Sequence, residues 1–246
     1  MKRHSKVIAN GWQFNADRMK FELQNIINLT STVHADGLTG ISLTSRTGDI
    51  LSGFEYTPRI MYPPFRTQLM TEEYPEIFFD LDICKTIPVY HMLDYNKPTP
   101  VLKGIFKEIN DFLIEKNCNP CRMRLSCLRP GQTIPKHSDG GGFKLHIPIV
   151  TDSDVVFNVN NKNYILEEGN VYIVDVGTHH YYTNNSHIDR WHLICDIYDI
   201  GCNFEIGNYT QEEFEIEKEN AELWRTWVDG TRTEGPTRIR LGKRNI

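Results

Sequence analysis

The chain after Asn119 is divided into short strand-like segments by turn residues, and this pattern constrains the fold more than any other feature of the 246-residue sequence. Runs of Pro, Gly and Asn separate segments that recur about every ten residues, which is typical of an antiparallel all-β fold. The predicted strands are Arg122–Leu128, Phe143–Thr151, Asp154–Asn160, Asn163–Leu166, Asn170–Val176, His180–Thr183 and Arg190–Tyr198. The pattern predicts a β-sandwich or a jelly roll for this part of the chain.

Helical patterns lie on both sides of the strand-rich region. Asn15–Leu29 and Val101–Asn117 each carry one apolar stripe at helical spacing, and Gln211–Val228 is an acidic amphipathic segment. Thr39–Tyr56 alternates as a strand and then turns, whereas Thr57–Tyr74 is rich in proline and aromatic residues and is expected to be a surface loop. The fold class is therefore mainly β with flanking helices.

Neither a Pro/Gly/Ser linker nor an internal repeat divides the chain, so we expect a single domain. Its predicted parts are a mixed helix and strand support over 1–118, a jelly-roll catalytic core over 119–200, and a C-terminal helix with a basic tail over 201–246. The Arg-rich tail, Thr231–Ile246, is expected to be a solvated end, not a binding patch.

Composition narrows the class of protein further. The formal net charge of −5 gives no general attraction to nucleic acid, so no nucleic-acid partner is expected. Apolar runs stay far below the ~18–20 residues of a membrane span, and Val7-Ile8-Ala9 is too short for the core of a signal peptide. We therefore expect a cytoplasmic protein without membrane contact.

Six cysteines in a chain of this length do not form a disulfide scaffold. Cys118 and Cys121 have the spacing of a zinc or redox pair, but no second pair follows, and a helix-like segment precedes them. They are expected to be reduced thiols in the connection between the predicted helix and the strand Arg122–Leu128.

The residues that can carry chemistry cluster in the strand-rich region. His137 and Asp139 lie two positions apart, so on an extended segment both side chains point to the same face. His180, on a later strand, can complete a two-histidine, one-carboxylate set, which suits non-haem Fe(II) and leaves coordination positions open. Arg190 follows at the start of the last strand, where a guanidinium can hold a carboxylate with two hydrogen bonds. The alternative is a set of satisfied polar residues on sheet faces.

At these residues the sequence resembles the aspartyl/asparaginyl β-hydroxylase-like family of Fe(II)/2-oxoglutarate dioxygenases, which includes free-amino-acid hydroxylases such as bacterial proline hydroxylases. The matching stretches lie between residues 122 and 199, in the family's order. They are Leu125–Gly131, Pro135–Asp139, Phe143–Pro148, Glu167–Val171, Val174–His180 and Arg190–Asp196. The resemblance implies a double-stranded β-helix, the jelly-roll core that cupins share.

Carried over by position, the resemblance makes His137, Asp139 and His180 the iron ligands. It implies that Arg190 and Ser126 bind the distal carboxylate of 2-oxoglutarate, with Lys144 and His146 near a carboxylate of co-substrate or substrate. Arg124, two residues before Ser126 on the same strand, would contact the substrate. The presence of Asp139 favours hydroxylation over halogenation, because iron-dependent halogenases leave that ligand position open for chloride.

Some of these residues have a plainer interpretation. Lys144 can be a solvent-facing residue of an alternating strand, and His146 a histidine satisfied inside the barrel. Asp175 can orient His180 or can simply stabilise a turn. His187 and His192 carry no spacing signal and are interpreted as structural.

The adjacent histidines His179 and His180 must point to opposite sides of a strand, so only one of them can face the interior. The return from His180 to Arg190 through the Asn184-Asn185-Ser186 turn brings two inward side chains together, which favours His180 as the ligand.

The expected function is an Fe(II)- and 2-oxoglutarate-dependent dioxygenase that uses O₂, with ascorbate as a supporting reductant. The resemblance implies hydroxylation of an aliphatic carbon of an amino acid, free or within a peptide or protein, with release of succinate and CO₂. The alternatives are a dioxygenase that acts on another small molecule, and a non-catalytic cupin-like module that binds or senses a metal.

Overall fold

The computed structural model describes residues 7–30, 33–35, 38–54, 92–137, 139, 143–198 and 210–228. The predicted loop Thr57–Tyr74 and the basic tail Thr231–Ile246 lie outside the described residues. Within the described ranges, none of the helices combines the length and apolar character needed to span a membrane.

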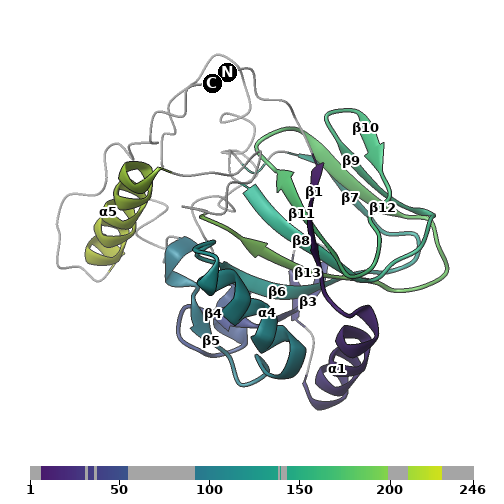
Figure 1. Cartoon of the computed structure of the whole chain (residues 1–246), viewed down its shortest axis with the longest axis horizontal. Coiled ribbons are helices and arrows are strands. Elements are labelled where there is room, and N and C mark those ends of the chain that lie inside the picture. Colours follow the sequence, from purple (N-terminus) through teal and green to yellow (C-terminus); the bar gives the residue numbers. More distant parts are fainter. Residues whose placement is uncertain are drawn as a thin grey trace.

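Eight consecutive strands form two antiparallel sheets that face each other (Figure 1). They are β6 (Cys121–Leu128), β7 (Thr133–His137), β8 (Phe143–Val150), β9 (Val155–Val159), β10 (Lys162–Tyr164), β11 (Asn170–Asp175), β12 (His180–Asn184) and β13 (Arg190–Asp196). The order β11-β8-β13-β6 in one sheet and β10-β9-β12-β7 in the other means that the chain passes repeatedly between the sheets. This is the strand order of a jelly roll, so the predicted fold class is confirmed.

Each of the seven predicted strands is present, with ends that shift by at most two residues. The sequence pattern missed β7, because Pro135 removes an amide donor from it. β7 lies at the edge of the four-stranded sheet, where a missing donor leaves no ladder hydrogen bond unmade. The pattern therefore failed where edge position overrides local propensity.

Further strands extend the large sheet to seven (Figure 1). β1 (Val7–Gln13) pairs with β11, while β3 (Leu38–Ser42) pairs with β6 and carries β2 (Val33–Ala35) beyond it. β1 was not predicted: its register shifts between Ala9 and Gln13, and Gly11 has a φ of +82°. Its short apolar start becomes a strand because β11 offers an edge to pair with.

Three helices flank the sheets: α1 (Ala16–Leu29), α4 (Gly104–Glu115) and α5 (Gln211–Val228). The Asn15 side chain caps α1 by accepting a hydrogen bond of 2.9 Å from the Arg18 amide. α4 is shorter than predicted, because the amides of Leu102 and Lys103 bond to carbonyls within a preceding turn. α5 has its predicted bounds and packs through Phe214 against Tyr198.

Short elements complete the described structure. They are β4 (Thr44–Ser45), β5 (Lys97–Pro98) and the single-turn helices η1 (Leu51–Phe54) and η2 (Met92–Asp94). Cys118 precedes β6 and Cys121 is its first residue; both are buried, and neither is in a disulfide.

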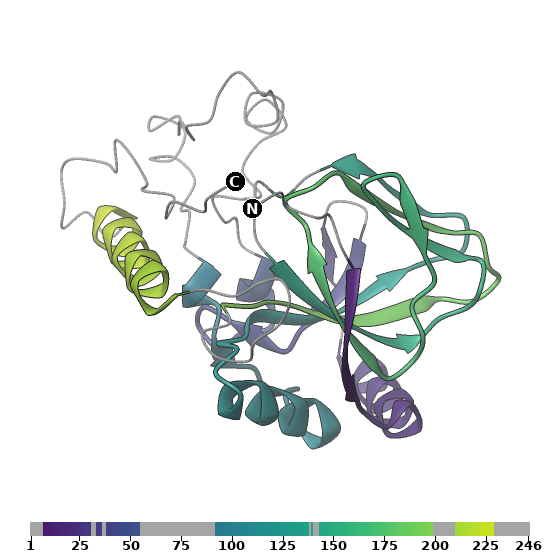
Figure 2. The same ribbon diagram turned by 45° about the horizontal axis from the view of Figure 1, so that its top comes forward.

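The two faces of the large sheet have opposite character. Its outer face is apolar and is covered by α1 and α4, which lie on the same side of the sheet (Figure 2). The residues in this core include Met19, Leu23, Ile26, Ile105, Phe106, Ile109, Leu125, Leu145, Ile147, Ile173 and Leu193. Because strand side chains alternate, the residues between these positions face the smaller sheet. On β6, β8 and β13 those inward residues are largely polar.

Candidate metal centre

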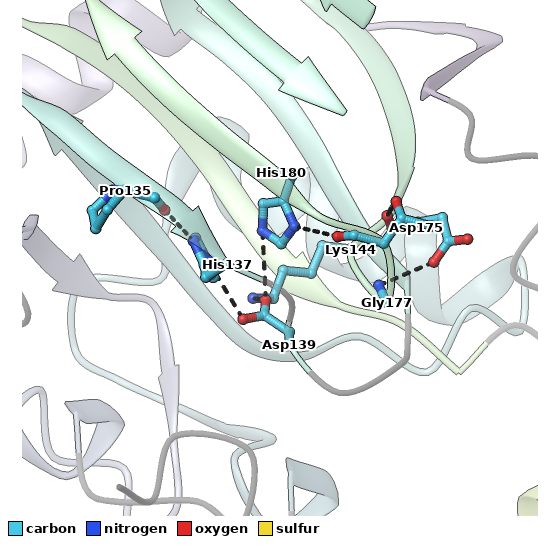
Figure 3. Close-up of polar contacts among 8 residues, drawn as sticks. Pro135, His137, Asp139, Lys144, Asp175, Gly177 and His180 are labelled. Carbon is cyan, nitrogen blue, oxygen red and sulfur yellow. Dashed lines mark hydrogen bonds and ion pairs between the residues drawn. The ribbon is translucent and has the colours of Figure 1, made fainter. Parts of the chain in front are cut away.

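Three potential metal ligands meet where β7 and β12 lie side by side. His137 ends β7 and pairs directly with His180, the first residue of β12, while Asp139 follows β7 by two positions. His137 Nε2 lies 3.6 Å from Asp139 Oδ1, and His180 Nε2 lies 4.0 Å from Asp139 Oδ2. One ligand atom of each residue lies within 4.8 Å of the others. The three side chains converge on one point (Figure 3).

Both histidine rings are oriented in the same way. His137 Nδ1 contacts the Pro135 carbonyl at 2.7 Å, and His180 Nδ1 contacts the Thr178 carbonyl at 2.9 Å (Figure 3). A carbonyl oxygen can only accept, so each Nδ1 carries the proton and donates. Each Nε2 therefore presents a lone pair toward Asp139, which is the tautomer that a metal ligand requires.

The charges and the burial of the site keep Asp139 ionised and His180 neutral, which are the protonation states that a metal ligand requires. Burial acts to raise the pKa of the Asp139 carboxyl, but the charges of Lys144, His180 and His137 outweigh it and hold that pKa well below its usual range. Lys144 Nζ forms an ion pair with this carboxylate, so Lys144 faces the site instead of solvent. Burial lowers the pKa of His180 to about 4, which keeps its imidazole neutral.

The turn between β11 and β12 holds two of the three ligands. The Asp139 amide donates to the Val176 carbonyl at 2.9 Å, and the Thr178 carbonyl accepts from His180. Asp175 stabilises this turn, because its carboxylate accepts from the Gly177 amide at 3.0 Å (Figure 3). This hydrogen bond is that of a turn residue, the second of the two interpretations of Asp175.

The adjacent histidines point in opposite directions, as predicted. His180 is only 1% exposed and lies with His137 and Asp139, whereas His179 is exposed.

Because of this difference, we expect His180→Ala to lower the affinity for Fe(II) or Mn(II) by at least about a hundredfold, more than the loss typical of a residue that only supports a ligand. His179→Ala should keep an affinity close to that of the wild type. Calorimetric titration of the metal-free protein with Mn(II) measures both. The opposite ranking of the two variants would contradict the assignment of His180.

A buried polar cluster lies on the inner face of the large sheet. We define it as Ser126, His146, Arg190 and His192, each at most 2% exposed. The register pairs His192 with Ser126 and Ile194 with His146, so these side chains share one face. The Arg190 guanidinium lies 5.6 Å from the centre of the Tyr182 ring.

Most polar atoms of this cluster have no hydrogen-bond partner among the residues that the structure describes. These atoms are Ser126 Oγ, Arg190 Nε and Nη1, and both ring nitrogens of His146 and of His192. Buried polar atoms of a folded protein are normally bonded, so such a concentration indicates a binding site. His146 is therefore not the satisfied barrel histidine considered above.

The sequence analysis interprets His192 as structural, whereas the structure places it in this polar cluster. It lies two positions after Arg190 on β13, and alternation alone places both on one face. This signal was available in the sequence. What the sequence could not supply was the polar partner across the strand, Ser126.

The two buried histidines of the cluster, His146 and His192, make the stability of the folded protein depend on pH. Burial lowers the pKa of His146 and of His192 well below 6.5, so both are neutral in the folded protein. The unfolded chain takes up protons at these residues below about pH 6.5, and the folded chain does not. We therefore expect the Tm of the metal-free protein to fall as the pH is lowered from about 7 to about 5.

Thermal unfolding at several pH values measures this, and His146→Phe should flatten the dependence. His187→Phe, which changes an exposed histidine, should keep the wild-type slope. A Tm that stays constant over this range would contradict the prediction.

Taken together, the fold and the site define a jelly-roll protein with a candidate two-histidine, one-carboxylate metal centre. Two neutral imidazole nitrogens and one carboxylate fit a divalent first-row metal ion and leave positions for further ligands. Residues 92–199 match the model of the aspartyl/asparaginyl beta-hydroxylase family, and the resemblance inferred from the sequence is thereby confirmed. This match supports a function of the dioxygenase type.

Solved structures similar to the chain include a predicted oxalate decarboxylase from Thermotoga maritima, with 21% identity, coverage of 35% of this chain and 71% of that chain, and a TM-score of 0.28. A 2OG-Fe(II) oxygenase family oxidoreductase from Burkholderia pseudomallei matches at 15% identity, over 32% of this chain and 43% of that chain, with a TM-score of 0.28. A cupin superfamily protein from Desulfitobacterium hafniense matches at 14% identity, over 31% of this chain and 66% of that chain, with a TM-score of 0.26. The comparison with curated protein sequences gave no match. The fold assignment depends on the strand order and not on these similarities.

Proposed function

We propose that the protein is an Fe(II)- and 2-oxoglutarate-dependent dioxygenase that hydroxylates an aliphatic carbon of an amino acid, free or within a peptide or protein. The observation that supports this most is a buried arginine, Arg190, whose guanidinium has unpartnered nitrogens and lies against the Tyr182 ring, which in turn meets the ring of the candidate ligand His180. A module that only bound a metal would have no need of such a cation.

In this proposal His137, Asp139 and His180 hold the iron. When bound, the iron and 2-oxoglutarate supply the oxidation: one atom of O₂ enters a C–H bond of the substrate, and the other enters succinate as CO₂ is released. The protein binds and orients the reactants around that centre.

Different residues of the inner face bind different carboxylates of the co-substrate and the substrate. Arg190 and Ser126 bind the distal carboxylate of 2-oxoglutarate, because both are almost completely buried and belong to the same polar cluster. Burial lowers the pKa of Arg190 to about 10, so its guanidinium is still charged at neutral pH. Lys144 contacts Asp139 of the metal centre, and His146 follows it by two positions on the same face of β8, so a second carboxylate would bind near these two residues.

Arg124 is the proposed contact for the substrate. It is only partly buried, and it lies two residues before Ser126 on the inner face of β6. Its partial exposure suits a residue that meets an incoming anionic group.

The test is turnover with Fe(II), 2-oxoglutarate, O₂ and ascorbate. Succinate should form, and mass spectrometry of panels of amino acids and peptides should find a product heavier by one oxygen. Arg190→Met serves as the inactive control. If the wild type, loaded with iron, neither binds 2-oxoglutarate nor forms succinate with any panel member, the proposal is wrong, and the non-catalytic cupin-like module becomes the better interpretation.

A further inference from the structure

His192 lies within the polar cluster, in the middle of the inner face of the large sheet. His192 lies directly across from Ser126 on β6 and from Pro148 on β8, and it is 2% exposed. Its ring meets the ring of His146 edge to face, with the centres 5.9 Å apart. It therefore shares one buried surface with Arg190 and Ser126.

The surroundings of His192 determine its chemical form. Burial, together with the charge of Arg190, lowers the pKa of its imidazole well below 6.5. A neutral imidazole has one N–H donor and one acceptor nitrogen. Neither ring nitrogen has a hydrogen-bond partner among the described residues. A buried donor without a partner destabilises the folded chain, so the residue costs stability unless something binds to it.

An inventory of the cluster identifies the kind of ligand that fits. Arg190 Nε and Nη1, the Ser126 hydroxyl, and one N–H each from His146 and His192 can all donate. Acceptors are fewer, because only the hydroxyl oxygen and one nitrogen of each ring can accept. The cluster also contains one positive charge, that of Arg190. This excess of donors around a cation suits a carboxylate, whose two oxygens accept up to about four hydrogen bonds.

We propose that His192 is a co-substrate-binding residue, whose imidazole N–H donates a hydrogen bond to the distal carboxylate of 2-oxoglutarate beside Arg190 and Ser126. This inference rests on the proposed function and assigns to His192 a part in co-substrate selectivity. Arg190 supplies the charge, whereas Ser126 and His192, paired across β6 and β13, supply neutral donors from adjacent strands.

The experiment measures binding of two keto acids to the full chain loaded with Mn(II), without O₂, by calorimetry. 2-Oxoglutarate carries the distal carboxylate, and 2-oxopentanoate has the same chain length without it. His192→Phe keeps a ring of similar shape and removes both nitrogens. His192→Gln keeps an N–H donor, and His187→Phe changes an exposed histidine as a control.

The wild type should prefer 2-oxoglutarate strongly. In His192→Phe, the Kd for 2-oxoglutarate should rise about tenfold or more, as expected for loss of a hydrogen bond to a charged group. The Kd for 2-oxopentanoate should stay close to the wild-type value, and His192→Gln should restore part of the preference. His187→Phe should behave as the wild type.

A second readout separates a binding role from a structural one. Without ligand, the Tm of His192→Phe should equal or exceed that of the wild type, because an unpartnered buried donor has been removed. A structural role predicts a lower Tm and equal weakening of both keto acids, and that result would overturn the inference.

If His192→Phe does not fold, the wild type itself still provides the test. In protein labelled with ¹⁵N-histidine and loaded with Zn(II), the ring nitrogen resonances of His192 should shift on addition of 2-oxoglutarate and not of 2-oxopentanoate. Unchanged resonances would overturn the inference. If the wild type shows no preference between the two keto acids, the proposed function fails; if the preference persists fully in His192→Phe, only the role of His192 fails.

Discussion

Asp139→Ala is expected to abolish hydroxylation and to lower the affinity for Fe(II) or Mn(II) by at least about a hundredfold. Asp139 provides the only carboxylate of the candidate metal centre. Without it, two neutral imidazoles would hold a divalent cation beside the positive charge of Lys144, which now lies against the carboxylate. The repulsion from that ammonium adds to the loss of a ligand.

Metal content after dialysis and calorimetric titration with Mn(II) measure the loss. Removing one partner of a buried ion pair also destabilises the fold, so circular dichroism must show that the variant is folded. Asp139→Asn keeps the shape without the charge and should lose affinity as well, whereas Asp154→Ala, at an exposed position, should not. Undiminished turnover with unchanged metal content would refute the role of Asp139.

Arg190→Met is expected to weaken binding of 2-oxoglutarate by roughly a few hundred- to a few thousand-fold, while the affinity for metal changes little. Loss of a buried charged partner typically costs ~3–5 kcal/mol, which corresponds to that factor in affinity. Arg190 is 1% exposed, so water cannot readily replace the guanidinium. Methionine is unbranched and can follow much of the same path without the charge.

The dependence of turnover on 2-oxoglutarate, measured together with metal affinity, checks this prediction. Arg129→Met changes an exposed arginine immediately after β6 and serves as the control. An Arg190→Met variant with an unchanged requirement for 2-oxoglutarate would show that Arg190 does not bind the co-substrate.

Much of the fold was accessible from sequence, because strands with regular alternation and strong turn residues are specified locally. β13 is an example: apolar residues at Trp191, Leu193 and Cys195 alternate with Arg190 and His192, so one face must be apolar and the other polar. The same rule separated His179 from His180. It did not reveal β1 or β7, whose existence depends on a neighbouring strand.

The sequence by itself determined which side chains share a face within each strand, since alternation is a property of the extended backbone. Only the tertiary structure decided which strands pair, and therefore that His180 lies against His137 and that His192 lies against Ser126. These contacts join residues far apart in the chain, and no local pattern encodes them. They form because the apolar outer face of the large sheet must be buried under α1 and α4, which leaves the polar face enclosed between the two sheets.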